Sequence, residues 1–497
     1  MGDMGRAGLN LVVVCFDTLR RDAVAGDLCR TPTLDHFAER AVVYTNAWAE
    51  GLPTIPFRRA VHTGMRSYPW RHHLGDRGSF PNLLGWHAIP EYQTTLAEHL
   101  YRRGYATGLV SDVWHLFKAS MNFVRGFVSW DFIRGQEGDT HTLSREAFED
   151  PSPHAGRRIG PAPYLYQTRD RQADEDYFVA QVFDRAADWV EGMQRAGPYF
   201  LWVDSFTPHE FWDPPARFAD LYCPGEGRGD HIVPQSLNRA PGRPEPDPRD
   251  IARTRALYQG YVTFADERLG RFLDRLKRCG ALADSVVVIL SDHGTELWDQ
   301  GQFGKSGARL HAYNTQINWL VRHPDLDRRV EVPAWVQNQD VVPTLLDLVG
   351  GPHPSVDGGV VWPFASHPAP PRDHVVIGWE THASVREERW NLLMDATEPT
   401  APPRLYDLAA DPREEHNVIS EHPEVVIRLR SRLEAVLGEP LPARFGHRPA
   451  GGFAATPSGL RQVRQRLAPA GPARVAGEGA GPAGPTPQGR WEGSNLV

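Results

Sequence analysis

A hydroxyl and a guanidinium lie four residues apart in the segment 51–65, GLPTIPFRRAVHTGM. Pro56 suits the first turn of a helix, because its ring fixes φ and its missing N–H needs no partner there. The segment is therefore predicted to lead into a helix, with Thr54 at the N-terminus and Arg58 about one turn later. The free N–H groups of that end favour anions. We interpret Thr54 as a nucleophile for an anionic ester, against the alternative of an ordinary capped surface helix.

Two apolar runs elsewhere in the chain end in acidic residues. Residues 9–16 precede Asp17, and residues 286–290 precede Asp292 and His293. Parallel strands present their carboxyl ends at one edge of a sheet, where open α/β sheets bind ligands, so we expect these side chains to meet. Two carboxylates, an imidazole and an alkoxide suit Zn²⁺, Mn²⁺, Mg²⁺ or Ca²⁺. The predicted ligands of one such ion are Asp17, Thr54, Asp292 and His293.

Strand and helix patterns alternate around these motifs. The nearly continuous apolar run at 9–16 is typical of a strand that is buried on both faces. An amphipathic helix is predicted over 95–103, followed by a strand over 105–110. This alternation predicts an α/β fold with a mostly parallel central sheet flanked by helices. The polar segments 134–165 and 216–250 are predicted to be long loops.

The pattern changes near the C-terminus. From about residue 370, short strand patterns precede a helical pattern over 424–437, which predicts a small antiparallel sheet packed by one helix. The last stretch is dominated by Gly, Ala, Pro and Arg, a composition typical of disorder. We therefore predict a catalytic domain over 8–369, a C-terminal subdomain over 370–440 and a disordered tail over 441–497.

Composition narrows the classes of partner and compartment. The 497 residues carry a formal net charge of -8 without a long basic run, so we expect no nucleic-acid partner. No window approaches 18 apolar residues and no signal-peptide pattern is present, so we expect no membrane association. The four scattered cysteines favour a reducing compartment, and we expect a cytoplasmic protein. The sequence allows a homo-oligomer.

Taken in order, the motifs resemble the sulfatase branch of the alkaline phosphatase superfamily. The resemblance covers about residues 8–437 and implies an alkaline-phosphatase-like sandwich with a small C-terminal subdomain. The segments that carry it are LVVVCFDTLRRD at 11–22, TPTLD at 31–35, TIPFR at 54–58, HTG at 62–64, WHL at 114–116, PHE at 208–210, LSDHG at 290–294, GK at 304–305, DVVPT at 340–344 and LYDL at 405–408.

The resemblance implies roles for the residues at the centre of the site. Asp17, Asp292 and His293 resemble the family's metal ligands. Thr54 occupies the position of the family's nucleophile, and Arg58 resembles the residue that orients this nucleophile.

It also implies roles for residues around that centre. Lys305 and His209 resemble the cationic groups that hold the substrate oxyanion and protonate the leaving group. His115 resembles the histidine that assists at the nucleophile. Three further positions are candidate substrate contacts: His311, Gln136 and Glu137.

Three departures from the family pattern bear on the substrate. Sulfatases use a cysteine or serine that is oxidised to formylglycine, whereas the methyl group on Cβ of Thr54 prevents that conversion, so no formylglycine is expected. The family's lysine before the WH pair is replaced by the segment 111–113, SDV. Thr18 stands where a second acid follows Asp17 in the family. These departures favour a phosphodiester or phosphonate ester over a sulfate ester.

The sequence thus predicts a metal-dependent hydrolase of small anionic esters that acts through a Thr54 alkoxide and a covalent intermediate. One alternative is a soluble transferase that passes the same group to an alcohol. Another is a sulfatase-like binding protein whose catalytic site has decayed.

Overall fold

The computed structural model describes residues 8–24, 26–70, 83–139, 161–193, 197–224, 232–239, 242, 244–397 and 402–444. Their centre is an eight-stranded sheet in the order β12-β2-β11-β8-β1-β7-β5-β6. All neighbours in this sheet pair in parallel except those of β11, which is antiparallel to β8 and β2. The strands are β1 (Asn10–Phe16), β2 (Val42–Tyr44), β5 (Ala106–Ser111), β6 (Ser129–Phe132), β7 (Tyr199–Ser205), β8 (Ser285–Ser291), β11 (Trp319–Arg322) and β12 (Val330–Val332).

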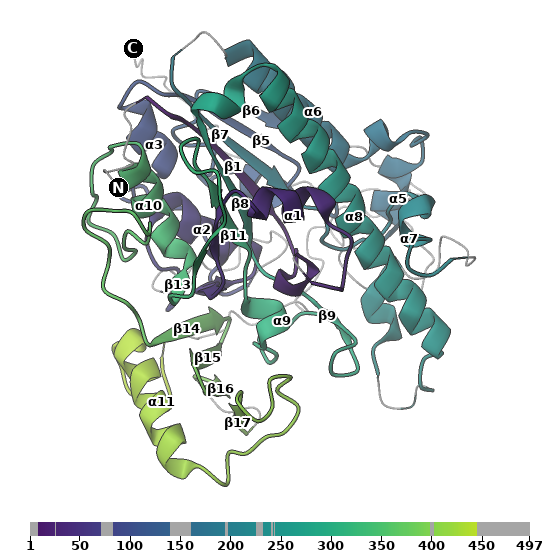
Figure 1. Ribbon diagram of the computed structural model, residues 1–497. Helices are drawn as coiled ribbons and strands as arrows, with labels where there is room; N and C mark the ends of the chain where they lie inside the picture. The colour runs from purple at the N-terminus through teal and green to yellow at the C-terminus, as the bar shows by residue number, and fades with distance from the viewer. Residues whose placement is uncertain are drawn as a thin grey trace, which may run out of the picture. The chain divides into compact units, whose positions relative to one another are not determined.

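The central strands are apolar on both faces because helices cover both faces. Along β1, Val12 and Val14 belong to one hydrophobic cluster, whereas Leu11 and Val13 belong to the other. Successive side chains of a strand point to opposite faces, so these two clusters are the cores on the two sides of the sheet. Figure 1 shows α6 and α8 on one face and α2, α3 and α10 on the other. The prediction of a mostly parallel sheet between helix layers is confirmed.

The helices begin and end at recognisable residues. Thr95 caps α3 with a capping box to Glu98, and Pro248 opens α8 after an Asp247 cap. Gly64 ends α2 in the left-handed conformation that glycine adopts without strain. The helices are α1 (Pro32–Ala38), α2 (Thr54–Thr63), α3 (Leu96–Tyr101), α5 (Pro161–Thr168), α6 (Phe178–Met193), α7 (Ala216–Ala219), α8 (Pro248–Arg278), α9 (Ala312–Thr315), α10 (Val341–Leu348) and α11 (Pro423–Leu437).

A second, smaller sheet has the order β17-β16-β15-β14-β4 and is packed by α11 (Figure 1). Its four C-terminal strands are antiparallel, and its edge strand β4 comes from the N-terminal part of the chain and pairs in parallel with β14. Its strands are β4 (Gly51–Leu52), β14 (His374–Trp379), β15 (His382–Glu387), β16 (Trp390–Asp395) and β17 (Arg404–Asp407). Two further pairs of short strands are β3 (Ala47–Trp48) with β13 (Val336–Gln337) and β9 (Glu296–Leu297) with β10 (Phe303–Gly304).

The structure differs from the sequence expectations mainly in the long loops. The helix α5 occupies residues that we predicted as loop, and α7 and a short 3-10 helix (Pro234–Leu237) interrupt the second predicted loop. Proline at or just before the first helical position starts each of these elements, a signal that the overall polarity of the segments hid. Most of the predicted tail, residues 445–497, lies outside the described residues, and the predicted domain boundaries stay a prediction. Among the helices that the structure describes, none is long and apolar enough to span a membrane.

Candidate active site and metal centre

The two strand-end carboxylates meet at the carboxyl edge of the central sheet. Phe16 of β1 and Ser291 of β8 are register partners, so the residues that follow them, Asp17 and Asp292, leave the sheet side by side. The backbone N–H of Asp292 donates to the carbonyl of Phe16 (3.1 Å), which continues the pairing past the strand ends. Both carboxylates are fully buried.

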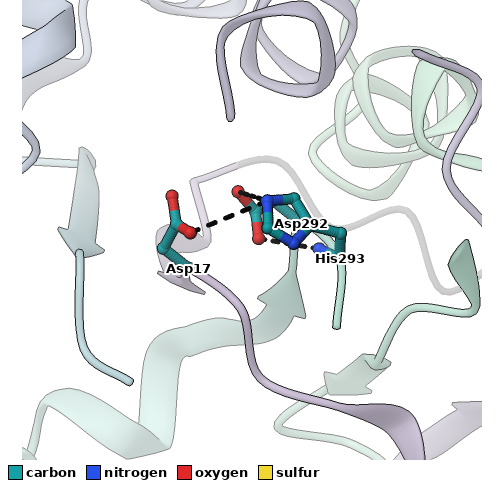
Figure 2. A group of neighbouring side chains, drawn as sticks. All are labelled: Asp17, Asp292 and His293. Carbon is teal, nitrogen blue, oxygen red and sulfur yellow. Dashed lines mark hydrogen bonds and ion pairs between the residues drawn. The ribbon is translucent and has the colours of Figure 1, made fainter. Parts of the chain in front are cut away.

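His293 completes a group whose ligand atoms all lie within 4.8 Å of one another: Asp17, Asp292 and His293. In Figure 2 the carboxylate of Asp17 points toward the imidazole, and Asp292 lies beside the same ring. The ring Nδ1 of His293 donates to the Gly294 carbonyl (2.9 Å), which leaves the lone pair of Nε2 available. Nε2 is buried, has no hydrogen-bond partner, and lies 3.5 Å from Asp292 Oδ2 and 3.8 Å from Asp17 Oδ1.

Burial lowers the pKa of His293 to about 3, so the imidazole is neutral near pH 7, as a metal ligand must be. Two buried carboxylates and a neutral imidazole with an unpartnered nitrogen are a donor set that suits a divalent cation. The residues present therefore fit a divalent metal ion.

Arg58 joins the metal-ligand carboxylates to a third carboxylate, Asp204. Its Nη1 donates to Oδ2 of Asp292 (2.6 Å) and of Asp17 (3.1 Å). On the other side, Nε and Nη2 donate to the two oxygens of Asp204 (2.9 and 2.7 Å). This bidentate geometry fixes the plane of the guanidinium. The three carboxylates raise the pKa of Arg58 despite its complete burial, so the side chain stays charged.

Thr54 is the first residue of α2, as the sequence predicted, and its side chain is buried at the start of this helix. Arg58 contacts the Thr54 carbonyl through Nη1 (3.4 Å), because the two residues are one helical turn apart. The same guanidinium nitrogen thus touches Thr54, Asp17 and Asp292. The helix start, with its free N–H groups, is thereby placed at the carboxylate cluster.

Lys305 and His209 share a carboxylate that the sequence analysis did not assign a role, Glu210. Lys305 Nζ donates to Glu210 Oε2 (2.8 Å) and approaches Thr18 Oγ1 (3.4 Å). Thr18 in turn donates to Asp17 Oδ1 (2.8 Å), which connects Lys305 to the metal-ligand group. His209 Nδ1 lies 3.1 Å from the same Glu210 oxygen.

A second histidine–carboxylate pair consists of His115 and Glu137. Nε2 of His115 lies 3.1 Å from Glu137 Oε2, which also accepts a hydrogen bond from Trp114 Nε1 (2.7 Å). Burial lowers the pKa of His115 to about 4, and its Nδ1 is buried without a hydrogen-bond partner. The rings of His115 and His209 both pack on Phe206 (centroids 5.9 and 4.1 Å away), so the two pairs belong to one region.

The remaining predicted contacts are placed differently. Gln136 is buried, and its side-chain amide donates to Asp112 Oδ2 (3.2 Å). It therefore stabilises the segment that leads into His115. His311 Nδ1 lies 3.0 Å from Glu414, in the loop between the small sheet and α11. Among the described residues, no metal-ligand cluster joins His311 to the group formed by Asp17, Asp292 and His293. The predicted roles of Gln136 and His311 stay predictions.

Sequence reasoning missed three buried carboxylates in this region. Asp204 is the partner of Arg58, and Glu210 is the partner of Lys305 and His209. Asp112 accepts a hydrogen bond from the backbone N–H of Phe206 (2.7 Å), and burial raises its pKa to about 7. A signal was available for Asp204, because it lies in the apolar strand β7, where an unpaired acid is costly.

Comparisons with known proteins identify similar sequences over most of the chain. The family described as "Sulfatase" matches residues 9–351. Arylsulfatase K of Rattus norvegicus is 22% identical over 484 residues, which cover 88% of this chain and 80% of the relative. Choline-sulfatase of Rhizobium meliloti is 23% identical over 452 residues, which cover 83% of each chain.

Solved structures show the same fold. The phosphonate monoester hydrolase of Agrobacterium radiobacter superposes with a TM-score of 0.66 at 21% identity, covering 86% of this chain and 95% of that one. A protein solved in complex with its substrate D-glucosamine-2-N,6-O-disulfate gives a TM-score of 0.66 at 19% identity and covers 87% of this chain and 98% of its own. Because the family match extends over more than half of the sequence, this chain belongs to the sulfatase family.

Proposed function

We propose that this protein is a metal-dependent hydrolase of anionic esters that uses the hydroxyl of Thr54 as its nucleophile. The observation that carries the proposal is the position of Arg58, whose Nη1 contacts the Thr54 carbonyl and two of the three candidate metal ligands. The guanidinium contacts the backbone of Thr54, and a residue with a hydroxyl at a helix N-terminus beside a candidate cation site suits nucleophilic attack on an anionic ester.

The proposed reaction has two displacement steps. Thr54 Oγ1 forms a bond to the phosphorus or sulfur atom, the bond from that atom to the leaving oxygen breaks, and the leaving oxygen takes a proton. Water then attacks the same atom, and the bond from that atom to Thr54 Oγ1 breaks. One proton of the water returns to Oγ1, and the oxyanion leaves. A divalent ion bound by Asp17, Asp292 and His293 would lower the pKa of the Thr54 hydroxyl and neutralise the ester oxygens.

Two histidines have complementary roles in this scheme. His115 is neutral, is oriented by Glu137 through Nε2, and has an unpartnered Nδ1, which suits a base that receives the proton of Thr54. His209 also packs on Phe206, shares Glu210 with Lys305, and is proposed to give its proton to the leaving oxygen. Lys305 and Arg58 hold the charge of the transferring group.

For the substrate we propose a phosphodiester or a phosphonate monoester ahead of a sulfate ester. The methyl group of Thr54 excludes the aldehyde that sulfatases form from cysteine or serine at this position. Similar proteins carry names from both groups: arylsulfatase and choline-sulfatase act on sulfate esters, and two structural neighbours are phosphonate monoester hydrolases. The choice between a phosphorus ester and a sulfate ester therefore depends on the proposed nucleophile rather than on the names of the relatives.

The proposal is tested with four p-nitrophenyl esters: phosphate monoester, phosphodiester, phosphonate monoester and sulfate. Each is assayed with Mn²⁺, Zn²⁺ or Ca²⁺. We expect Thr54→Ala to lower kcat by about 10³-fold or more, because it removes the nucleophile, and Thr54→Ser to keep measurable turnover. Thr63→Ala is the matched control, since this hydroxyl of the same helix, within the described part of the chain, donates to the Arg59 carbonyl and accepts from the Met65 N–H.

Each outcome separates the alternatives. Full activity of Thr54→Ala would overturn the nucleophile. Product formation that requires an added alcohol, without free phosphate, would identify a transferase. Absence of hydrolysis of all four esters, in protein that also binds no metal, would identify a decayed site.

A further inference from the structure

Glu210 is a buried carboxylate placed among the cations that face the proposed substrate. Oε2 accepts from Lys305 Nζ (2.8 Å) and lies 3.1 Å from His209 Nδ1, and Oε1 accepts from the side-chain amide of Gln235 (2.8 Å). The side chains of Glu210, Lys305 and His209 are all close to 10% exposed. This carboxylate therefore interacts with two groups of the hydrolysis scheme, Lys305 and His209, whereas Arg58 has its own carboxylate partners.

The charge of Glu210 is maintained by its neighbours. Burial by itself raises the pKa of a carboxyl, but the positive charges of Lys305 and His209, with the Lys305 hydrogen bond, outweigh this effect and lower the pKa of Glu210 to about 2. The side chain is thus an anion throughout the neutral range. It therefore adds a full negative charge to a site that is proposed to bind an anionic ester.

This negative charge changes how many substrate charges the site can accept. One carboxylate within hydrogen-bond distance cancels most of the field of one cation at the transferring group, because screening by water is weak in a buried site. Arg58, the other cation at the centre, already has three carboxylate partners. Apart from the charge of the divalent ion in the proposed function, each additional charge on the substrate oxygens therefore meets little uncompensated positive charge from these side chains.

From this arrangement we propose that Glu210 restricts the site to ester groups with a single negative charge, namely phosphodiesters, phosphonate monoesters or sulfate esters. It does so by discriminating against the dianion of a phosphate monoester. The inference rests on the proposed function and names the charge class of its substrate. Glu210 acts through Lys305 and His209, so it is a specificity-determining residue that need not touch the reacting atoms.

The test uses two substrates with the same leaving group. Above pH 7, p-nitrophenyl phosphate carries two charges, because the second pKa of a phosphate ester is about 6, whereas methyl p-nitrophenyl phosphate carries one. The quantity measured at pH 8 is the ratio of kcat/KM for the monoester to kcat/KM for the diester. We expect Glu210→Gln to raise this ratio by about tenfold or more, because it removes one charge near the transferring group.

A purely structural role gives a different result. If Glu210 only positions Lys305, Glu210→Gln lowers kcat/KM for both esters by a similar factor, and an unchanged ratio overturns the inference. Glu210→Asp is the matched control, since it keeps the charge, and its ratio should stay within about threefold of the wild type. An Asp ratio that rises as far as the Gln ratio would also overturn the inference.

Failure of the proposed function gives a separate signal. If the wild type hydrolyses neither ester, the same two compounds serve as ligands in titration calorimetry, and the affinity ratio must shift toward the dianion in Glu210→Gln. An unshifted ratio, or no binding of either compound to either protein, overturns the inference. If Glu210→Gln does not fold, Glu210→Ser replaces it. If neither folds, the wild type decides, because an equal or higher kcat/KM for the monoester contradicts the restriction.

Discussion

Charged side chains at this site are buried together with partners of opposite charge, without which their burial would be too costly. Arg58 is completely buried and is held by Asp17, Asp204 and Asp292. Such clusters contribute little net stability, because the loss of hydration offsets the attraction between the charges. Their value lies in fixed geometry at a reacting centre, where donors that are already oriented stabilise developing charge. The cluster around Arg58 is therefore best explained by chemistry rather than by folding.

The first prediction at the residue scale concerns His62, which lies in the same helix α2. It is buried, stacks on Trp202 (ring centroids 4.3 Å apart), and neither ring nitrogen has a hydrogen-bond partner. Burial first, and then the charge of Arg58, lower the pKa of His62 from 6.5 to about 3. Between these pH values the unfolded state binds the extra proton, so stability is lost as the pH falls below about 6.5.

We expect this one group to remove about 2 kcal/mol of unfolding free energy between pH 6.5 and pH 5. His62→Phe, which keeps the aromatic packing, should reduce the loss by that amount in urea titrations at the two pH values. The exposed His36, changed to Phe in the same way, is the control for the substitution itself. An identical pH dependence in His62→Phe and the wild type would show that His62 does not resist protonation.

At the scale of elements, the turn after β8 positions the candidate metal ligand His293. Gly294 follows His293 directly and accepts the hydrogen bond from the His293 ring on its carbonyl. Its own N–H donates to the Asn314 carbonyl (3.0 Å), which draws the turn against the start of α9. A Cβ at this position would lie 2.0 Å from the Tyr313 carbonyl oxygen and 2.9 Å from a side-chain carbon of Arg20. The close approach of backbone to backbone thus requires glycine.

Gly294→Ala is therefore expected to force the turn away from Tyr313 and to cost about 1–3 kcal/mol of stability, as overpacking does. Because His293 precedes the displaced residue, the affinity for a divalent ion should fall by about tenfold. Chemical denaturation measures the first effect and metal titration monitored by calorimetry the second. Gly192→Ala in α6 is the control, since a Cβ there has open space and the helix gains from alanine. Wild-type metal affinity in Gly294→Ala would show that the turn does not position His293.

At the scale of the whole molecule, the small sheet is attached to the catalytic part by shared residues. The strand β4 pairs with β14 and ends two residues before Thr54, so the small sheet borders the proposed nucleophile directly. Glu414 makes a second link: it contacts His311 (3.0 Å) and accepts hydrogen bonds from Arg386 (2.8 Å) and Asn391 (2.7 Å) of the small sheet. These links predict that both sheets unfold together.

Glu414→Gln should lower the free energy of unfolding by about 3–5 kcal/mol, because it leaves the buried Arg386 without its counter-charge. We expect the transition to remain single and to have the same midpoint by circular dichroism and by tryptophan fluorescence. The exposed neighbour Glu415, changed to Gln, should have an effect below about 0.5 kcal/mol. Two separated transitions, or an unchanged stability in Glu414→Gln, would contradict the link.

Much of the site could be predicted from the sequence because its parts are local. Asp17 directly follows a nearly continuous apolar run, and Asp292–His293 follow another with only Ser291 between; such runs become adjacent parallel strands whose ends share an edge. Thr54 and Arg58 are one helical turn apart on a segment with its own start signal in Pro56. Periodicity and proline position carry this information without any knowledge of the rest of the chain.

Contacts between distant segments were decided by the tertiary structure alone. Glu210 meets Lys305 across 95 residues, and Asp204 meets Arg58 across 146. The apolar strand around Asp204 indicates that this carboxylate is buried, but no local pattern names its partner, and nothing local separates Glu210 from a solvated acid. The sequence by itself determined the sulfatase-like α/β fold, the metal-ligand candidates and the hydroxyl at the start of α2. The tertiary structure decided which buried charges face one another, since electrostatic interactions act through space and not along the chain.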